Sequence, residues 1–193
     1  MMEDRNLDLE LVRKVQSGNK RAFDLLVIRY QHKVVSLINR FLHNYEESED
    51  VAQETFIKAY KALANFRGDS AFYTWLYRIA VNSAKNHLAS KKRRPPSSDI
   101  DSKDAEQIDI NSGLKDIATP EHNLIRDEMQ RTIIDSIANL SEDLRITISL
   151  RELEGMSYEE IAEIMSCPVG TVRSRIFRAR EAIDVKLQPL LNN

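Results

Sequence analysis

Apolar side chains recur every three or four residues along most of the chain, the spacing that places them on one face of an α-helix. Strand-like alternation is scarce, and only five glycines and five prolines punctuate the sequence. The sequence therefore predicts an all-α fold. In the first half of the chain, the predicted helices cover residues 8–16, 23–41, 48–63 and 75–94.

A break in this pattern divides the chain. A Pro-Pro-Ser-Ser stretch ends the fourth helix, and residues 99–118 are polar and acidic with no sustained period, as in a linker. Thr119 and Pro120 then form a typical helix start, and Ser141 is placed to cap a further helix. We therefore predict two small helical domains joined by a flexible acidic linker. The domains are residues 1–94 and 120–193, and the linker is residues 95–119.

The last third of the chain contains the pattern of a helix-turn-helix. Ser157 followed by Glu160 is a capping box, which satisfies the unpaired amides at a helix start. Met156 and Ile161 occupy the two hydrophobic positions around that cap. A three-residue break containing proline follows, and a second helix begins near Val169.

This second helix has an unusual outer face. At about 100° per residue, Ser174 and Phe177 lie opposite the apolar stripe, flanked by Arg173 and Arg178. Such a helix is often only a solvated surface, but a capped helix and a short turn precede it here, as in a major-groove recognition helix. Arginine pairs with guanine edges or phosphates, and an aromatic ring contacts a thymine methyl group. We therefore predict duplex DNA binding. The stripe comprises Val169, Val172, Ile176, Ala179 and Ile183.

Aromatic side chains are concentrated between residues 56 and 77, which hold seven of the chain's 13, with basic residues interleaved. Part of this set must fill the core, but we do not expect all of it to point inward. Exposed rings beside cations bind single-stranded DNA by stacking on bases and contacting phosphates. Asn82 follows on the same helix, and its amide either reads an extruded base or is an ordinary surface group. Pattern alone leaves core filling and strand binding open.

Charge and cysteine content narrow the class of protein. The net charge is −2, but residues 50–94 carry 9 basic and 3 acidic side chains, whereas residues 95–150 carry 5 basic and 12 acidic ones. Such asymmetry indicates a charged partner. Cys167 is the only cysteine, so an intrachain disulfide is excluded and a reducing cytosol is favoured. We find no secretory signal and no apolar run approaching the ~18 residues of a membrane span.

An acidic cluster at residues 46–54 raises the possibility of a metal or diphosphate site. No second acidic motif faces it, and the four histidines are isolated in the sequence. A partner-binding or solvated face is favoured. We expect no metal, no cofactor and no catalytic residues, and hence no enzyme activity.

With both domains placed, the chain resembles the extracytoplasmic-function group of bacterial sigma factors, and its envelope-stress members above all. The segment Asp50–Phe56 matches the group's D-x-x-Q-E-x-F motif for the polymerase clamp. The segments 66–68 and 75–80 match its promoter-melting and minus-ten region. Residues 140–145 and the helix-turn-helix match its minus-thirty-five domain, although members usually have proline where Ser141 stands.

The resemblance implies roles for particular residues. The first domain would dock on RNA polymerase core and hold the non-template strand of the minus-ten element, with one base flipped out. The second would read the minus-thirty-five element. The implied polymerase-binding residues are Asp50, Gln53, Glu54 and Phe56; those for minus-ten recognition and melting are Phe66, Arg67, Phe72, Tyr73, Trp75, Asn82 and Lys85; those for the minus-thirty-five element are Arg151, Thr171, Arg173, Ser174, Phe177 and Arg178.

The resemblance also implies partners and location. The partners would be RNA polymerase core, double- and single-stranded promoter DNA and an anti-sigma factor, often membrane-anchored, that covers both binding faces. The protein itself would be cytoplasmic, with no insertion into the membrane, and its linker would thread toward the polymerase active-site and RNA-exit channel. The main alternative is a one-component transcriptional regulator that binds operator DNA without polymerase. A nucleic-acid enzyme and a helical adaptor are weaker alternatives.

Overall fold

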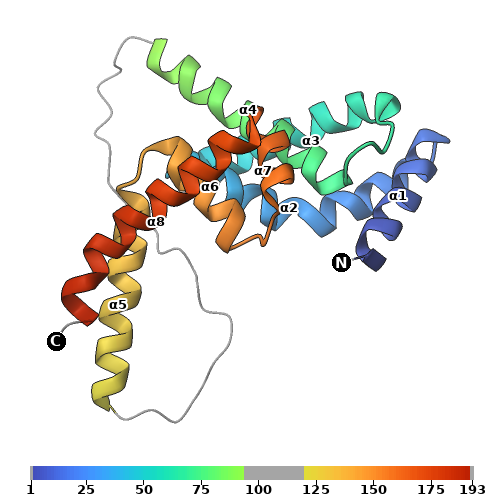
Figure 1. The fold of residues 1–193 in the computed structure, drawn as a ribbon. Helices are drawn as coiled ribbons and strands as arrows, with labels where there is room; N and C mark the ends of the chain where they lie inside the picture. Colours follow the sequence, from blue (N-terminus) through green and yellow to red (C-terminus); the bar gives the residue numbers. More distant parts are fainter. Residues whose placement is uncertain (1, 94–119, 192–193) are drawn as a thin grey trace. The chain divides into compact units, whose positions relative to one another are not determined.

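The computed structural model describes residues 2–93 and 120–191, and the predicted acidic linker lies outside these residues (Figure 1). The described residues form α-helices and one 3-10 turn in two compact units, which confirms the all-α, two-domain prediction. The first-half elements are α1 (Met2–Gln16), α2 (Lys20–Leu42), α3 (Tyr45–Ala62), the turn η1 (Leu63–Asn65) and α4 (Phe72–Arg93). The second-half elements are α5 (Pro120–Ala138), α6 (Glu142–Glu152), α7 (Tyr158–Met165) and α8 (Val169–Leu191).

Helix α2 is the centre of the first unit, because it packs against α1, α3 and α4. Its predicted apolar stripe is buried, with Leu26, Val34, Leu37 and Ile38 completely shielded from solvent. Burying one such side chain stabilises a fold by about 1.5–3 kcal/mol. The stripe therefore supplies a large part of the free energy that holds the four helices together.

All four helices predicted in the first half of the chain begin three to six residues earlier than predicted. Helix α3 begins at Tyr45 rather than near Ser48, because the Asn44 side chain caps it by accepting a 3.0 Å hydrogen bond from the Glu47 amide. The Ser48 hydroxyl instead donates to the Asn44 carbonyl at 2.6 Å, inside the first turn. Helix α1 begins at Met2, six residues before the predicted start.

In the second unit α8 packs along α5 and α6 (Figure 1). The middle of its predicted stripe, Val172, Ile176 and Ala179, is buried. Ser141 stands immediately before α6 as predicted, but its side chain makes no capping hydrogen bond. Its backbone carbonyl accepts the Arg145 amide at 2.9 Å, so the first turn closes through the main chain.

The predicted helix-turn-helix is present in α7 and α8. The Ser157 amide donates to the Glu160 carboxylate at 2.8 Å, and the Glu160 amide donates to the Ser157 hydroxyl at 3.2 Å. These reciprocal bonds are the predicted capping box. Met156 and Ile161, on either side of it, are buried. Residues 166–168 form the short turn before α8.

Candidate nucleic-acid interface

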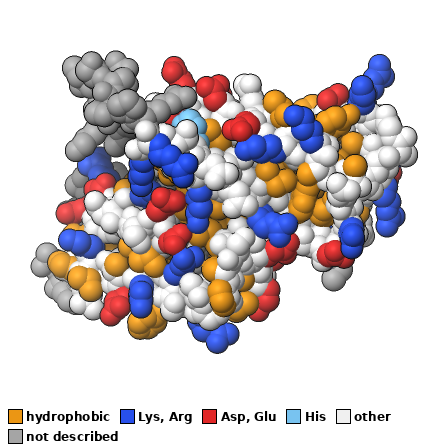
Figure 2. Space-filling model, turned by 90° about the horizontal axis from the view of Figure 1, so that it is seen from above, with side chains coloured by type: hydrophobic (Ala, Val, Ile, Leu, Met, Phe, Trp, Pro, Cys, Tyr) orange, Lys and Arg blue, Asp and Glu red, His pale blue; other side chains and the backbone are white. Residues whose placement is uncertain are grey.

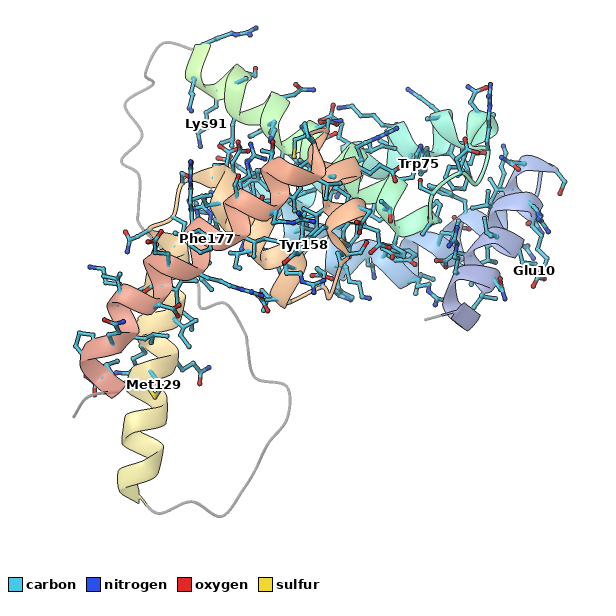
Figure 3. The ribbon with its side chains drawn as sticks, in the orientation of Figure 1. Glu10, Trp75, Lys91, Met129, Tyr158 and Phe177 are labelled. Carbon is cyan, nitrogen blue, oxygen red and sulfur yellow. The ribbon has the colours of Figure 1, made fainter. Side chains whose placement is uncertain are left out.

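Helix α8 presents the predicted aromatic side chain to solvent. Phe177 is 68% exposed and lies on the face opposite the buried stripe (Figure 3). Leaving a phenylalanine in water forgoes the benefit of burial, so the position is unlike a core site. Arg173 and Arg178 are exposed beside it, and neither makes a hydrogen bond or ion pair with another residue that the structure describes. The outer face of α8 thus offers two uncommitted guanidinium groups and one ring.

The other two arginines of α8 bind α6 instead. Arg175 pairs with Asp143, and the Arg180 guanidinium donates to Glu152 at 2.6 Å. The hydrogen bond with Glu152 raises the pKa of Arg180 above its ordinary value. Exposed pairs of this kind add little stability. The packing of α8 on α5 and α6 orients the outer face, and the two pairs add links between α8 and α6.

Of the residues assigned to the minus-thirty-five element, Arg151 has a structural role in the free protein. The Arg151 guanidinium donates to the Met156 carbonyl at 2.6 Å and lies 5.0 Å over the Tyr158 ring, so it holds the start of α7 against the end of α6. Thr171 is half-buried, and its carbonyl accepts the Ser174 hydroxyl at 3.0 Å. Nothing in the free chain tests DNA contacts by Arg151, Thr171 or Ser174, which stay predictions.

The structure divides the aromatic cluster of the first unit between the core and the surface. Phe66 and Phe72 are buried, at 9% and 1% exposure. The Phe66 and Trp75 ring centroids lie 5.0 Å apart, and those of Phe72 and Trp75 5.8 Å apart. Both phenylalanines therefore point into the core, where their rings contact each other. Phe66 and Phe72 therefore form a floor rather than an open stacking surface.

The accessible part of this site comes from neighbouring positions. Tyr73 and Trp75 are half-buried at the start of α4, and Arg67 is exposed on the preceding loop. Asn82 is exposed and Lys85 half-buried further along the helix. These five side chains are the predicted strand-binding residues that solvent reaches in the free chain. Tyr60 of α3, another ring of the aromatic cluster, is 41% exposed.

A buried polar cluster beneath the site was not predicted. The Tyr30 hydroxyl donates to Asp8 at 2.5 Å, and Arg29 lies 3.4 Å from the same carboxylate, which is almost fully buried. Burial raises the pKa of Tyr30 above its ordinary value, and the bond to Asp8 adds to the effect. The Tyr30 ring lies 5.6 Å from that of Phe72. The available sequence signal for this cluster was Asp8, an acidic residue on the apolar face of α1.

The predicted polymerase-binding residues divide into two groups. Asp50, Gln53 and Glu54 are exposed on α3, and Glu54 pairs with Lys58 at 2.8 Å. Phe56 is buried, at 9% exposure, because it belongs to the inward face of the same helix. A direct contact by Phe56 would therefore have to be made through the groove that it lines.

Phe56 forms part of the floor of an open groove between α2 and α3. The groove has a volume of about 400 Å³. Figure 2 shows hydrophobic side chains reaching the surface among basic and acidic ones. The groove is lined by Lys20, Phe23, Asp24, Phe56, Ile57, Tyr60 and Lys61.

The acidic cluster of α3 is partly committed to packing. Glu47 accepts hydrogen bonds from Lys91 at 2.8 Å and contacts His87 at 3.1 Å, which joins α3 to α4. The bond from Lys91 lowers the pKa of Glu47. Within residues 2–93 and 120–191, no group of three or more His, Cys, Asp or Glu side chains is arranged to hold a metal ion. In the same ranges no helix combines the length and apolar character needed to cross a bilayer.

Comparison with known proteins identifies both units. Residues 26–94 match the model of sigma-70 region 2, and residues 130–183 match that of sigma-70 region 4. The RNA polymerase sigma-H factor of Pseudomonas aeruginosa is 64% identical over 95% of both chains. The ECF RNA polymerase sigma-E factor of Escherichia coli is 58% identical over 98% of this chain and 99% of its own.

Solved structures agree with this assignment. CnrH, determined in complex with the cytosolic domain of CnrY, aligns with a TM-score of 0.66 at 26% identity, over 95% of this chain and 98% of its own. The sigma factor RpoE of Bartonella quintana, determined with the anti-sigma factor NepR, shares the fold, with a TM-score of 0.62 at 22% identity over 86% of this chain and 96% of its own. The identity over nearly the whole length and the two matching regions show that this chain belongs to the extracytoplasmic-function group of sigma factors.

Proposed function

We propose that this sigma factor directs RNA polymerase core to promoters of an extracytoplasmic stress response through two separate DNA contacts. Residues 120–193 would hold the minus-thirty-five element as duplex, and residues 1–94 would bind core polymerase and capture the melted minus-ten strand. The observation that carries the proposal is the outer face of α8, where Phe177 is exposed between Arg173 and Arg178.

The α8 face suits the major groove. Arginine side chains without protein partners retain all their N–H donors for guanine edges or phosphates. Because α8 packs on α5 and α6, the helix presenting Phe177 is held in one orientation. Arg178 and Arg173 are the residues that we assign to base or phosphate contact, with Ser174 beside them.

For the melted strand, the described geometry refines the predicted set. Arg67, Tyr73, Trp75, Asn82 and Lys85 supply the solvent-accessible cations, rings and amide that a single strand uses. Phe66 and Phe72 contact the Trp75 ring from the core side. Capturing unstacked bases, at about 1–3 kcal/mol per base, would offset melting, which costs about 0.6–2.2 kcal/mol per step.

Partners follow from the family and from the exposed surfaces. Asp50, Gln53 and Glu54 form a polar, acidic strip on α3 that suits a basic surface of the polymerase core. CnrH, at 26% identity, was determined with a cytosolic domain of CnrY. We propose by analogy that this chain works in the cytoplasm and is restrained there by an anti-sigma factor, which a membrane anchor would hold at the inner membrane.

In vitro transcription with core polymerase on a genomic library tests the function. We expect the chain to confer initiation at a defined set of promoters that core alone ignores. Gel shifts with and without core provide the control, since a sigma factor needs core for tight specific binding. Tight specific binding by the isolated chain, with no effect on initiation, would support the one-component regulator instead.

The strand-binding assignment has its own test. Replacing Tyr73 with Ala should spare formation of the closed complex but impair opening, because a stacking ring is lost while the duplex contacts remain. Permanganate footprints on promoters from the library measure the opening. Normal footprints for the variant would contradict the assignment.

A further inference from the structure

The last residue of α1 is hydrogen-bonded to the loop that precedes α4. The Gln16 side-chain nitrogen donates to the Leu63 carbonyl and to the Phe66 carbonyl, each at 2.9 Å. A side-chain amide nitrogen carries two hydrogens, so both donors are used on this one turn. The two acceptors bracket η1, whose end is closed by a 3.1 Å bond from the Phe66 amide to the Leu63 carbonyl.

The Leu9 side chain of α1 lies close to the middle of the same loop. Gly68 has a φ of +80°, and a Cβ atom placed there would lie 3.6 Å from the Leu9 side chain. Glycine adopts this backbone conformation without the steric cost that other residues incur. Helix α1 therefore holds the loop by hydrogen bonds at Leu63 and at Phe66. Arg67, which we assign to strand binding, comes directly after the second of these points.

The contacts of Gln16 connect to the aromatic residues of the proposed site. The carbonyl that Gln16 holds belongs to Phe66, whose ring contacts both Phe72 and Trp75. A shift of the Phe66 backbone would therefore move the floor beneath Trp75. The side chain of Gln16 is itself exposed, so it adds little to core packing, and its evident effect is on the position of the loop.

We propose that Gln16 is a positioning residue for strand separation, which holds the loop at residues 66–71 in the conformation that captures the melted minus-ten strand. This inference rests on the proposed sigma function. Gln16 lies outside the segment that matches sigma-70 region 2, which begins at residue 26. A loop held in its binding conformation before the strand arrives loses less conformational entropy on binding, which favours opening.

The test uses the full chain assembled with core polymerase and a promoter recovered from the library experiment. Gln16→Leu keeps the size of the side chain but removes both donors. Opening of the duplex promoter should slow about fivefold to tenfold, as expected for two neutral hydrogen bonds. Closed-complex formation should be unchanged. On a template whose minus-ten region is already unpaired, the difference in initiation rate between the variant and the wild type should be much smaller.

Three controls separate positioning from a general defect. Asn6→Leu makes the same kind of change at another exposed position of α1 and should behave as wild type. Gln16→Lys keeps N–H donors and should recover part of the opening rate. Amide hydrogen exchange should accelerate in the Gln16→Leu variant at residues 63–71 but not in α2 or α3, which shows that the unit remains folded.

The outcomes are distinct. Opening by Gln16→Leu at the wild-type rate would overturn the inference and leave the sigma function intact. Equal defects on paired and unpaired templates, or no recovery with Gln16→Lys, would likewise reject a positioning role. Failure of the wild type to initiate on either template would refute the proposed function itself.

Discussion

The two units both carry aromatic residues among basic ones, but they present them in opposite ways. On α8 of the second unit, Phe177 is 68% exposed and its flanking arginines extend into solvent. In the first unit, Phe72 is 1% exposed and Phe66 9%, and the half-buried ring of Trp75 contacts both. One surface is an outward face of a helix, and the other is the edge of a packed core.

The difference corresponds to the two forms of DNA that we propose they bind. A duplex presents its base edges in a groove, so a reader must project side chains from a rigid helix. Unpaired bases expose flat faces, and a ring held by other rings can stack on them with little loss of freedom. In the first unit, the rings beneath the proposed strand-binding site therefore also stabilise the fold. In the second unit, the exposed Phe177 ring contributes little to folding stability.

The largest effect should come from comparing the alanine variants of Phe72 and Phe177. Phe72→Ala should lower the free energy of unfolding of the first unit by about 3–5 kcal/mol, because it leaves a cavity in the core. Phe177→Ala should change stability by less than about 0.5 kcal/mol, since the side chain is in solvent. Denaturation followed by fluorescence of Trp75, the only tryptophan, and by circular dichroism measures both. Similar losses of unfolding free energy in the two variants would contradict the difference between a buried ring in the first unit and an exposed ring in the second.

The second test compares two arginines of α8. Arg178→Ala should cost about 1–3 kcal/mol of specific promoter binding by the holoenzyme if its guanidinium reads a base edge. Arg180→Ala removes an arginine that is already paired with Glu152, and should cost much less. Gel shifts with substituted minus-thirty-five base pairs measure both affinity and specificity. Unaltered binding by the Arg178 variant would contradict the assignment of Arg178 to a base contact.

The third test concerns the polar cluster beneath Phe72. Tyr30→Phe should destabilise the first unit by about 1–3 kcal/mol at pH 8, because the buried Asp8 carboxylate loses a donor. The folded-state pKa of Tyr30 is raised, so its neutral form is favoured and its contribution is fully present below about pH 10. That contribution is lost as the pH rises further. Urea unfolding at pH 8 and pH 11 should therefore show a gap between wild type and variant that narrows at the higher pH. A constant gap would show that the pKa of Tyr30 is the same in the folded and unfolded states.

The smallest effect should come from the surface pair that joins α3 and α4. Glu47→Gln should cost less than about 1 kcal/mol at pH 7, because the carboxylate and Lys91 are both partly in solvent. The folded-state pKa of Glu47 is lowered, so its contribution is present above the ordinary glutamate value and is lost as the pH falls through the folded value. Thermal unfolding at pH 7 and pH 3 should show the difference only at pH 7. A loss of several kcal/mol would mean that the pair supports the first unit far more than its exposure implies.

Local sequence signals were sufficient for some of the features whose controlling groups lie within one turn of each other. The capping box at Ser157 and Glu160 and the outward position of Phe177 were both predicted correctly, because each depends on helical spacing alone. The start of α3 at Asn44 was missed although Asn is a strong capping residue, because Ser48 offered a competing signal four residues later. The direct contact residues for DNA and polymerase remain predictions.

The sequence by itself determined that this chain is helical and that a capping box precedes α7, because the 3.6-residue period and the capping chemistry act over a few neighbouring positions. Its motifs also carried the resemblance to sigma factors. Only the tertiary structure decided that Phe66 and Phe72 turn inward, that Asp8 is buried beside Tyr30, and that Gln16 holds a loop about 50 residues away. Those features depend on which helix faces pack together, and side chains distant in the chain meet only after the core has formed.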